Sequence, residues 1–278
     1  MTFRMRSALF TPATYPERFS KAKEVGADLL IIDLEDAIAP KDKTVARATA
    51  FATLNAAEKT PFPTIIRING LDTAAGLSDV LELLESQAQP EFLLLPKTES
   101  AAHLQILDRL IREKGLSTRL IGLIESAVGL KAVADIAHAT PRLAALMFGA
   151  ADLAADLGCG PFAANLTFAR VSLVSACTTA AIAAIDSPFF DILDLSGLER
   201  AAFQAADMGF AGKAAIHPSQ VAAINLAFTP TSDEIDEARA ILFENQRGVG
   251  QVNGVMVDEA VARKARRVLD RSGQSIGL

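Results

Sequence analysis

Three acidic residues follow directly after an apolar run near the start of the chain. Residues 29–40 read LLIIDLEDAIAP, so Asp33, Glu35 and Asp36 stand at the end of a segment typical of a strand buried on both faces. Three carboxylates within four residues repel one another, and burial raises their pKa values further. They therefore need a cation, an arginine or water beside them, and each partner implies a different chemistry.

A single arginine interrupts another β-branched apolar run, TIIRIN at 64–69. Burying this residue, Arg67, without a carboxylate partner would be costly. One interpretation is a structural ion pair with Glu35 or Asp36. The other is that these supporting acids hold the guanidinium toward a substrate carboxylate or a developing oxyanion. The two interpretations are compatible.

Two further acids follow apolar runs later in the chain. Glu125 ends RLIGLIE, and Asp152 ends FGAAD. Oxygen ligands without His or Cys favour Mg²⁺, or Mn²⁺, over Zn²⁺, and we predict that both residues bind the metal. An acid just after a strand is often only the N-cap of the next helix, which stays an alternative for Asp36 and Asp152. The small residues 149–151 would let backbone N–H groups approach an anion.

Four other residues at the ends of apolar runs carry weaker signals. Asp33 and Asp186 favour pairing with an arginine or support of a neighbouring ligand. Lys97, after LLLP, permits Schiff-base chemistry, although a metal-assisted enolate is the simpler route. His217, before Pro218, could be a base but is more typical of a hydrogen-bonded structural residue.

The elements that must position these residues alternate along the chain. Apolar runs separated by longer segments of helical period predict βα units and a parallel sheet. The predicted strands are residues 6–12, 28–35, 64–69, 91–97, 119–126, 143–149, 180–186 and 213–218. Eight units in about 225 residues favour an α/β fold of the (β/α)₈ TIM-barrel type, whose catalytic residues lie at the carboxyl ends of the strands. A doubly wound nucleotide-binding sheet is the alternative, but TPATYP stands where its G-x-G-x-x-G motif would be.

A C-terminal extension follows the predicted barrel domain of residues 1–228. Residues 229–278 contain a predicted helix over 231–246 with Ser232 or Asp233 as N-cap, a glycine-punctuated stretch over 247–258 and a basic amphipathic helix from 259. The glycines favour a lid, or an arm laid on a neighbouring subunit. A packed C-terminal clasp without chemistry is the alternative.

Composition excludes several classes of protein. The chain has 278 residues, 50% of them hydrophobic, and a formal charge of −6, which argues against sequence-independent nucleic-acid binding. No run of about 18 uncharged apolar residues could span a membrane, and the N-terminus lacks a signal-peptide pattern. Cys159 and Cys177 are interpreted as free thiols in a reducing compartment, so we expect a soluble cytoplasmic protein.

Stretches spread over nearly the whole chain resemble the HpcH/HpaI aldolase and citrate lyase β-subunit family, in particular its acyl-CoA lyase branch. They are RSALFTPA, DLLIIDLEDAIAPKDKTVAR, RIN, LLLPK, GLIESAVGL, FGAADLAADLG, AIDSPFFDI and GFAGKAAIHPSQV. The resemblance implies a trimeric or hexameric TIM barrel that uses Mg²⁺ to break or form a carbon–carbon bond beta to a thioester carbonyl. It also implies that Glu125 and Asp152 are the metal ligands and that Arg67 contacts substrate.

The C-terminal stretch NGVMVD, ending at Asp258, is similar to a segment of the malyl-CoA and citramalyl-CoA lyases. In that branch the segment lies over the neighbouring subunit's active site, which implies that Asp258 is a catalytic acid acting in trans. Its presence favours a self-sufficient CoA lyase over a non-catalytic or carrier-dependent citrate lyase β subunit.

The resulting hypothesis is a retro-Claisen cleavage of a 3-hydroxy-3-carboxyacyl-CoA, with a preference for (S)-citramalyl-CoA. Malyl-CoA or citryl-CoA cleavage and malyl-CoA thioester hydrolysis are the alternatives. Backbone donors of Gly149, Ala150 and Ala151 would hold the carboxylate of the small keto acid. The sequence does not locate the site of the CoA phosphates: Lys21, Lys41, Lys43 and Arg47 are candidates, but charges on helix faces are usually only solvated.

Overall fold

The structure is a computed structural model and describes residues 4–56, 62–87, 89–160, 164–248 and 250–273. The chain divides into two compact units, Met1–Ile224 and Asn225–Leu278. Each unit is described by itself below. The catalytic role given to the first and the lid role given to the second stay predictions.

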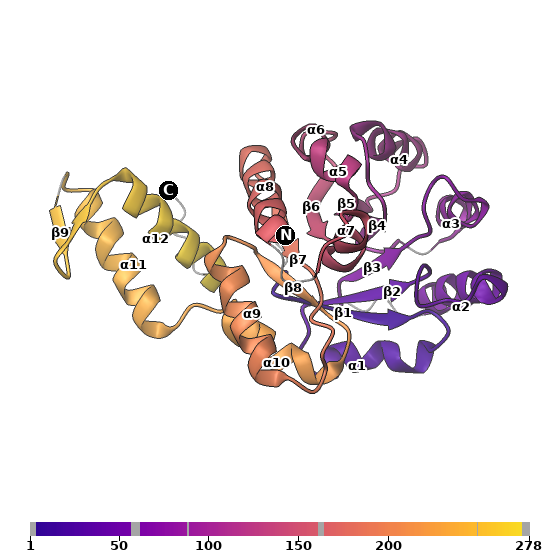
Figure 1. Cartoon of the computed structure of the whole chain (residues 1–278), viewed down its shortest axis with the longest axis horizontal. Helices are drawn as coiled ribbons and strands as arrows, with labels where there is room; N and C mark the ends of the chain where they lie inside the picture. Colours follow the sequence, from indigo (N-terminus) through magenta and orange to yellow (C-terminus); the bar gives the residue numbers. More distant parts are fainter. Residues whose placement is uncertain (1–3, 57–61, 88, 161–163, 249, 274–278) are drawn as a thin grey trace. The chain divides into compact units, whose positions relative to one another are not determined.

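The first unit is built on eight parallel strands that close into a barrel in sequence order, with β1 pairing to both β2 and β8 (Figure 1). The TIM-barrel prediction is therefore confirmed. The strands are β1 (Ser7–Pro12), β2 (Leu29–Asp33), β3 (Thr64–Arg67), β4 (Phe92–Leu95), β5 (Arg119–Ile124), β6 (Leu143–Phe148), β7 (Ala183–Asp186) and β8 (Gly212–Ala215).

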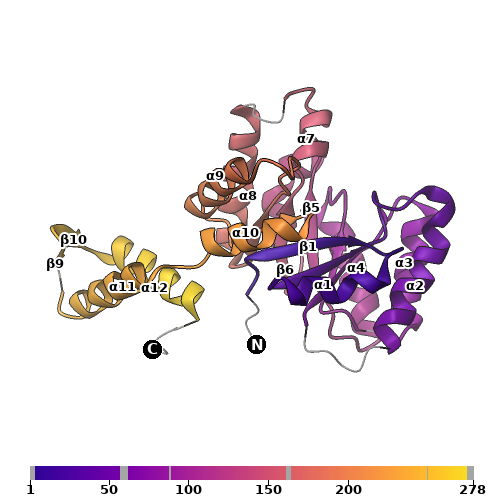
Figure 2. The ribbon, with the colours of Figure 1, turned by 90° about the horizontal axis from the view of Figure 1, so that it is seen from below.

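Helices ring the barrel on its outer side (Figures 1 and 2). The helical elements are η1 (Pro16–Arg18), α1 (Phe19–Glu24), η2 (Pro40–Asp42), α2 (Lys43–Ala56), α3 (Ala74–Glu85), α4 (Ala101–Glu113), α5 (Ala127–Lys131), α6 (Val133–Ala137), α7 (Ala150–Asp156), α8 (Ala164–Ala180), α9 (Leu195–Asp207), η3 (Pro218–Gln220) and α10 (Val221–Ala227). The strand predicted over 180–186 starts later, at Ala183, because α8 continues to Ala180 and the chain reverses at Ala181, with φ at +55°.

Alternate residues of the strands fill the barrel interior. From β2 these are Leu29 and Ile31, and from β5 they are Ile121 and Leu123. Side chains two residues apart share a face of a strand, so the next inward positions on β2 and after β5 are Asp33 and Glu125. The apolar interior therefore ends in acidic side chains at the carboxyl ends of the strands, which is the face where TIM-barrel active sites lie.

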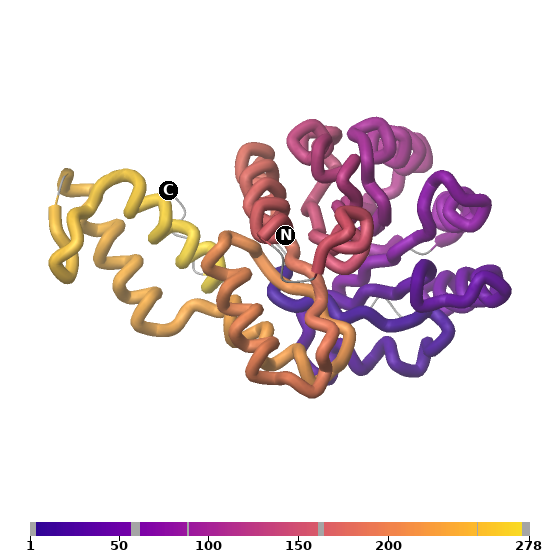
Figure 3. Tube along the Cα trace, in the orientation of Figure 1, coloured from indigo at the N-terminus to yellow at the C-terminus, as the bar shows by residue number. Residues whose placement is uncertain are grey.

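The second unit contains two long helices joined by a β-hairpin, as the tube in Figure 3 shows. Its elements are α11 (Ser232–Asn245), β9 (Gly250–Val252), β10 (Val255–Val257) and α12 (Glu259–Ser272). Left-handed Asn253 and Gly254, with φ of +50° and +81°, make the hairpin turn. The glycine-rich stretch is thus a hairpin at its centre, and its function as a lid stays a prediction.

Two local details of the second unit concern its helices. The predicted N-cap of α11, Ser232 or Asp233, was wrong: Thr231 caps the helix, and Glu234 completes a capping box with it. Helices α11 and α12 lie side by side and bury Ala238, Ala265 and Leu269 between them. Across the described part of both units, no helix has the length and apolarity needed to cross a bilayer.

Candidate active site

A pocket of about 450 Å³ opens at the carboxyl ends of the barrel strands. Four acidic side chains and one arginine line it: Asp33, Asp36, Arg67, Glu125 and Asp152. The rest of its wall is made largely of apolar and small residues, which are Phe10, Pro12, Ala37, Leu123, Met147, Phe148, Gly149, Ala150, Ala151, Pro188, Phe190 and Ile216. The structure therefore brings four of the predicted acids and Arg67 together in one cavity, whereas Glu35 and Asp186 do not occur among the described lining residues.

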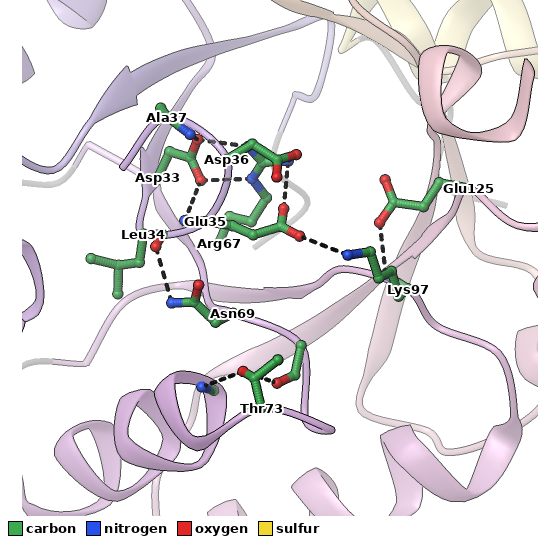
Figure 4. A network of polar contacts seen from close by, with 12 residues as sticks. Asp33, Leu34, Glu35, Asp36, Ala37, Arg67, Asn69, Thr73, Lys97 and Glu125 are labelled. Carbon is green, nitrogen blue, oxygen red and sulfur yellow. Dashed lines mark hydrogen bonds and ion pairs between the residues drawn. The ribbon is translucent and has the colours of Figure 1, made fainter. Parts of the chain in front are cut away.

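Arg67 is held mainly by Asp33, which confirms the arginine-pairing interpretation of Asp33, and the expected ion pairs with Glu35 and Asp36 are also present. Its Nε and Nη2 donate to Oδ1 and Oδ2 of Asp33 at 2.7 and 2.6 Å (Figure 4). Asp33 also accepts the backbone N–H groups of Glu35 and Ala37, so both of its oxygens are fully engaged. Asp33 is therefore a fixed holder for the guanidinium and not a free base.

The remaining nitrogen of Arg67, Nη1, lies 2.9 Å from Glu35 Oε2 and 3.6 Å from Asp36 Oδ2. The ring of Phe10 lies 4.9 Å from the guanidinium carbon. Burial acts to lower the pKa of Arg67, but its hydrogen bonds to Asp33 and the charges of Asp33, Glu35 and Asp36 raise it above its ordinary value. Arg67 is thus a permanent cation in a fixed orientation at the pocket wall.

Glu35 is buried, with 6% of its surface exposed, and does not occur among the described residues that line the pocket. Its Oε2 has the distance of an ion pair with Arg67 but not the direction of a hydrogen bond, and no described group satisfies it. Burial raises the pKa of Glu35 to about 7; the Arg67 charge opposes this rise, and Asp36 and Asp33 add to it. Glu35 therefore supports Arg67 less firmly than Asp33 does.

Glu125 follows β5 and is buried, with 4% of its surface exposed. Its Oε1 accepts the backbone N–H of Lys97 at 2.8 Å (Figure 4). Gly149 packs against it so closely that an added Cβ would collide with the Glu125 Cβ and lie 2.9 Å from Oε2. Burial raises the pKa of Glu125 to about 8; the Lys97 hydrogen bond opposes this rise, and the charges of Glu35 and Asp152 add to it.

Asp152 is exposed on the first turn of α7 and faces the same pocket as Glu125. The N-cap of α7 is Gly149 and that of η2 is Ala39, so neither Asp152 nor Asp36 is the helix cap considered from the sequence. Both carboxylates line the cavity, and the N-cap alternative is excluded for these two acids.

The pair of Glu125 and Asp152 fits a hard divalent cation. Glu125 is a buried carboxylate whose pKa is raised, so a cation beside it would offset the cost of its charge. Within the described residues, no group of three or more His, Cys, Asp or Glu side chains could hold a metal ion by itself. Substrate and water oxygens would complete the coordination, as is common for Mg²⁺.

The small residues after β6 differ in what they can offer to an anion. Gly149 lines the pocket, but its N–H already donates to the Ile124 carbonyl at 2.9 Å, so it is not available as predicted. Ala150 and Ala151 are the first residues of α7, whose N–H groups have no acceptor within the helix. Their predicted role in holding a carboxylate stays a prediction.

Asp186 does not occur among the described residues that line this pocket. Ile185 faces the interior, so Asp186, the next residue on β7, faces the helices. There its Oδ2 accepts from Lys213 Nζ at 2.6 Å and from Arg170 Nη2 at 3.1 Å. The arginine-pairing interpretation of Asp186 is confirmed, but its partner is Arg170 of α8.

His217 and Lys97 also follow strands of the barrel, and their side chains make different contacts. His217 is the N-cap of η3, and its Nδ1 lies 2.7 Å from Ser219 Oγ, as expected of a structural histidine. The side chain of Lys97 is 57% exposed, with Nζ 4.0 Å from Glu35 Oε1. Lys97 does not occur among the described residues that line the pocket.

Three of the four basic residues proposed for the CoA phosphates have partners within the chain. Lys43 Nζ donates to the carbonyls of Leu34 and Glu35. Arg47 pairs with buried Asp79 at 2.6 Å, and Lys21 pairs with Glu24 on the surface of α1. Lys43 and Arg47 therefore stabilise the β2 and β3 region, and a contact of any of the four residues with CoA phosphates stays a prediction.

Asp258 belongs to the second unit, where it is the N-cap of α12. Its Oδ1 accepts the backbone N–H of Val261 at 2.9 Å. Capping is therefore one function of this side chain, and the catalytic role inferred from NGVMVD stays a prediction. The apolar pocket wall, including Phe10, Met147 and Ile216, was missed by the sequence argument, which followed only polar residues.

Comparison with known proteins gives a consistent result over the whole chain. The family described as HpcH/HpaI aldolase/citrate lyase matches residues 6–218, and one described as C-C bond lyase of the TIM-barrel fold matches residues 166–274. The L-malyl-CoA/beta-methylmalyl-CoA lyase of Rhodobacter capsulatus is 35% identical over 298 residues, which cover 95% of this chain and 93% of the relative.

Two solved structures extend the comparison. RipC from Yersinia pestis is 52% identical, with a TM-score of 0.75, covering 84% of this chain and 100% of that one. CitE from Mycobacterium tuberculosis, in complex with magnesium, acetoacetate and coenzyme A, is 34% identical, with a TM-score of 0.81, covering 96% and 98%.

The barrel, its acid-lined mouth and these matches define a carbon–carbon lyase of the TIM-barrel class. The chain belongs to the HpcH/HpaI aldolase/citrate lyase family.

Proposed function

We propose that this protein is a Mg²⁺-dependent acyl-CoA lyase that cleaves a 3-hydroxy-3-carboxyacyl-CoA by a retro-Claisen reaction. The observation that carries the proposal is the convergence of Glu125, Asp152 and the fixed Arg67 on one cavity. The likeness to a malyl-CoA lyase, and to a CitE bound to magnesium and coenzyme A, supports the acyl-CoA substrate and the metal.

Glu125 and Asp152 would hold the cation, which when bound would supply Lewis acidity to the substrate's hydroxyl and adjacent carboxylate. The bond that breaks joins the hydroxyl-bearing carbon to the α-carbon of the thioester. The hydroxyl proton passes to solvent water, and the hydroxyl carbon becomes the carbonyl carbon of a keto acid. The electron pair of the broken bond passes into an acetyl-CoA enolate.

Arg67 would stabilise the negative oxygen of that enolate. Its guanidinium is oriented before substrate binds by the two hydrogen bonds from its Nε and Nη2 to Asp33, so little reorganisation is needed during the reaction. Asp258 would then protonate the enolate carbon, acting from a neighbouring subunit of a trimer or hexamer, and would remove a proton in the condensation direction.

The pocket wall supports a small keto acid with an apolar or hydrogen substituent. Arg67 is the one cationic side chain among the described lining residues, and Phe10, Met147 and Ile216 add apolar surface. The second carboxylate of a citryl-CoA substrate would need another cation to offset its desolvation. This favours (S)-citramalyl-CoA, which releases pyruvate, followed by malyl-CoA, which releases glyoxylate.

The test is an assay of the purified chain alone with citramalyl-CoA, malyl-CoA and citryl-CoA, with and without Mg²⁺, measuring acetyl-CoA and free CoA. We expect Mg²⁺-dependent acetyl-CoA release with kcat/KM highest for citramalyl-CoA and lowest for citryl-CoA. Free CoA as the first product would indicate thioester hydrolysis instead. No turnover of any CoA thioester, with turnover of a carrier-protein thioester, would indicate a carrier-dependent citrate lyase β subunit.

We also propose a cytoplasmic location, supported by the two cysteines. Both Cys159 and Cys177 are free thiols, and Cys177 is buried. Free thiols are typical of a reducing compartment.

A further inference from the structure

Lys97 has a backbone conformation that residues with a side chain rarely adopt. Its φ is +47°, in the left-handed region, where a Cβ crowds the neighbouring peptide group. Non-glycine residues keep this conformation only where the surrounding structure enforces it. Lys97 lies two residues after the end of β4, at the same end of the barrel as the pocket.

The surroundings of Lys97 fix this turn from both sides. Thr98 is buried; its N–H donates to the Leu123 carbonyl at 3.0 Å, and its Oγ1 donates to the Leu95 carbonyl at 2.9 Å. The Thr98 carbonyl lies against Gly129, where an added Cβ would come within 2.6 Å of it. The peptide group between Lys97 and Thr98 therefore has little freedom to rotate.

This turn directs one backbone hydrogen bond to Glu125, the proposed metal ligand. The Lys97 N–H points at Glu125 and donates to Oε1 at 2.8 Å (Figure 4). The lysine side chain leads elsewhere: its ammonium is 4.0 Å from Glu35 Oε1, a contact of ion-pair length only. The main chain and the side chain of Lys97 thus touch two different carboxylates.

We propose that Lys97 is a positioning residue that acts through its main chain. The left-handed turn aims the Lys97 N–H at Oε1 and so fixes the orientation in which Glu125 presents its carboxylate to the cation. The ammonium group is not required for this. The inference rests on the proposed function, since Glu125 is a metal ligand only under that proposal.

The test compares Mn²⁺ dissociation constants, measured by electron paramagnetic resonance, with the thermal unfolding midpoint of each variant. Lys97→Gly removes the ammonium but keeps the N–H and accepts the left-handed turn, so its Mn²⁺ affinity should stay within about twofold of the wild-type value. Lys97→Val opposes the turn and should weaken Mn²⁺ binding by about tenfold or more, the usual scale for the loss of a partner that orients a ligand.

Ala181→Val is the matched control. Ala181 also has a positive φ, of +55°, but it precedes β7, at the amino ends of the strands. Its replacement by valine should lower the unfolding midpoint without changing Mn²⁺ affinity. If Lys97→Val gives too little folded protein, Lys97→Thr makes the same demand on the backbone with a polar side chain.

Each outcome decides one question. Equal loss of Mn²⁺ affinity in Lys97→Gly and Lys97→Val would show that the ammonium matters and would overturn the inference. Unchanged affinity in Lys97→Val would also overturn it. A wild-type protein that binds neither Mn²⁺ nor Mg²⁺ would instead overturn the metal site of the proposed function.

Discussion

Both carboxylate oxygens of Asp33 hold Arg67, with Nε 2.7 Å from Oδ1 and Nη2 2.6 Å from Oδ2. This two-pronged pair fixes the plane of the guanidinium as well as its position. A lysine at the same site would keep the charge but could not reproduce the fork.

Arg67→Lys should therefore lower kcat by about two orders of magnitude, the scale of a lost oxyanion donor, while Mn²⁺ binding stays near the wild-type value. Steady-state assays with the best thioester, together with metal titration, check this. A kcat within a factor of three of wild type would remove Arg67 from the chemical step.

Glu125→Gln and Asp152→Asn should each weaken Mg²⁺ and Mn²⁺ binding by at least about tenfold, because each removes one charged oxygen ligand. Titration calorimetry of EDTA-treated protein measures this. Asp36→Asn is the control, since Asp36 lines the same pocket but is not a proposed ligand. Equal losses in all three variants would indicate a general charge effect and not coordination.

Gly149→Ala should weaken Mn²⁺ binding by about tenfold, because the added methyl group would displace the Glu125 side chain. Gly160→Ala provides the comparison: Gly160 follows α7, and nothing lies within 4 Å of its added Cβ. Crystal structures of both variants would show whether Glu125 moves. The prediction fails if Gly149→Ala binds Mn²⁺ like the wild-type protein.

Asp258→Asn separates capping from chemistry. Asparagine caps helices about as well as aspartate does, so the unfolding midpoint should change little, while turnover should fall by about two orders of magnitude. Asp258→Ala should lose turnover equally and also cost about 1 kcal/mol of stability, because the bond to Val261 N–H is lost. Normal turnover in Asp258→Asn would leave the residue with capping alone.

The stability of the metal-free protein should fall as pH rises. Burial raises the pKa of Glu35 to about 7 and that of Glu125 to about 8, both from an ordinary value near 4.5. The folded state therefore binds more protons than the unfolded state between these limits. The stabilisation that these two carboxyl groups give the folded state is complete below pH 4.5. It is lost as pH rises through 7 and 8.

Urea unfolding of EDTA-treated protein between pH 5.5 and 8.5 measures this loss, which should be on the order of 5 kcal/mol for the two groups together. Glu125→Gln should remove more than half of this pH dependence, because its amide does not titrate, whereas Glu35 still does. A wild-type profile that rises with pH over this range would contradict the assignment of these two carboxylates.

The barrel could be predicted from the sequence because fully buried parallel strands read as short apolar runs. All five residues of β2, Leu29–Asp33, are buried, and its predicted span differs from the observed one by no more than two residues at either end. The start of β7 at Ala183 was harder to predict. Alanine-rich sequence continues from α8 into β7, so no change of period marks the boundary.

Which acidic side chain pairs with which basic one could not be predicted from sequence spacing alone. Glu35 and Asp36 were the expected partners of Arg67 and do form ion pairs with it. Asp33 was expected to pair with an arginine that the spacing did not identify. It forms the bidentate pair with Arg67, because β2 and β3 place the two residues side by side in register. The same limit applies to Asp186. Its orientation depends on whether the last residue of β7 faces inward, and a single residue of register decides that.

The contacts of Gly149 have a consequence for the redesign of this protein. Its N–H ties the end of β6 to Ile124 of β5, its missing Cβ makes room for Glu125, and it begins the helix that carries Asp152. The spacing of the two proposed ligands is thus set by one peptide junction between adjacent strands. A change of metal preference would therefore require replacement of a ligand, because a shift of this loop would move both carboxylates together.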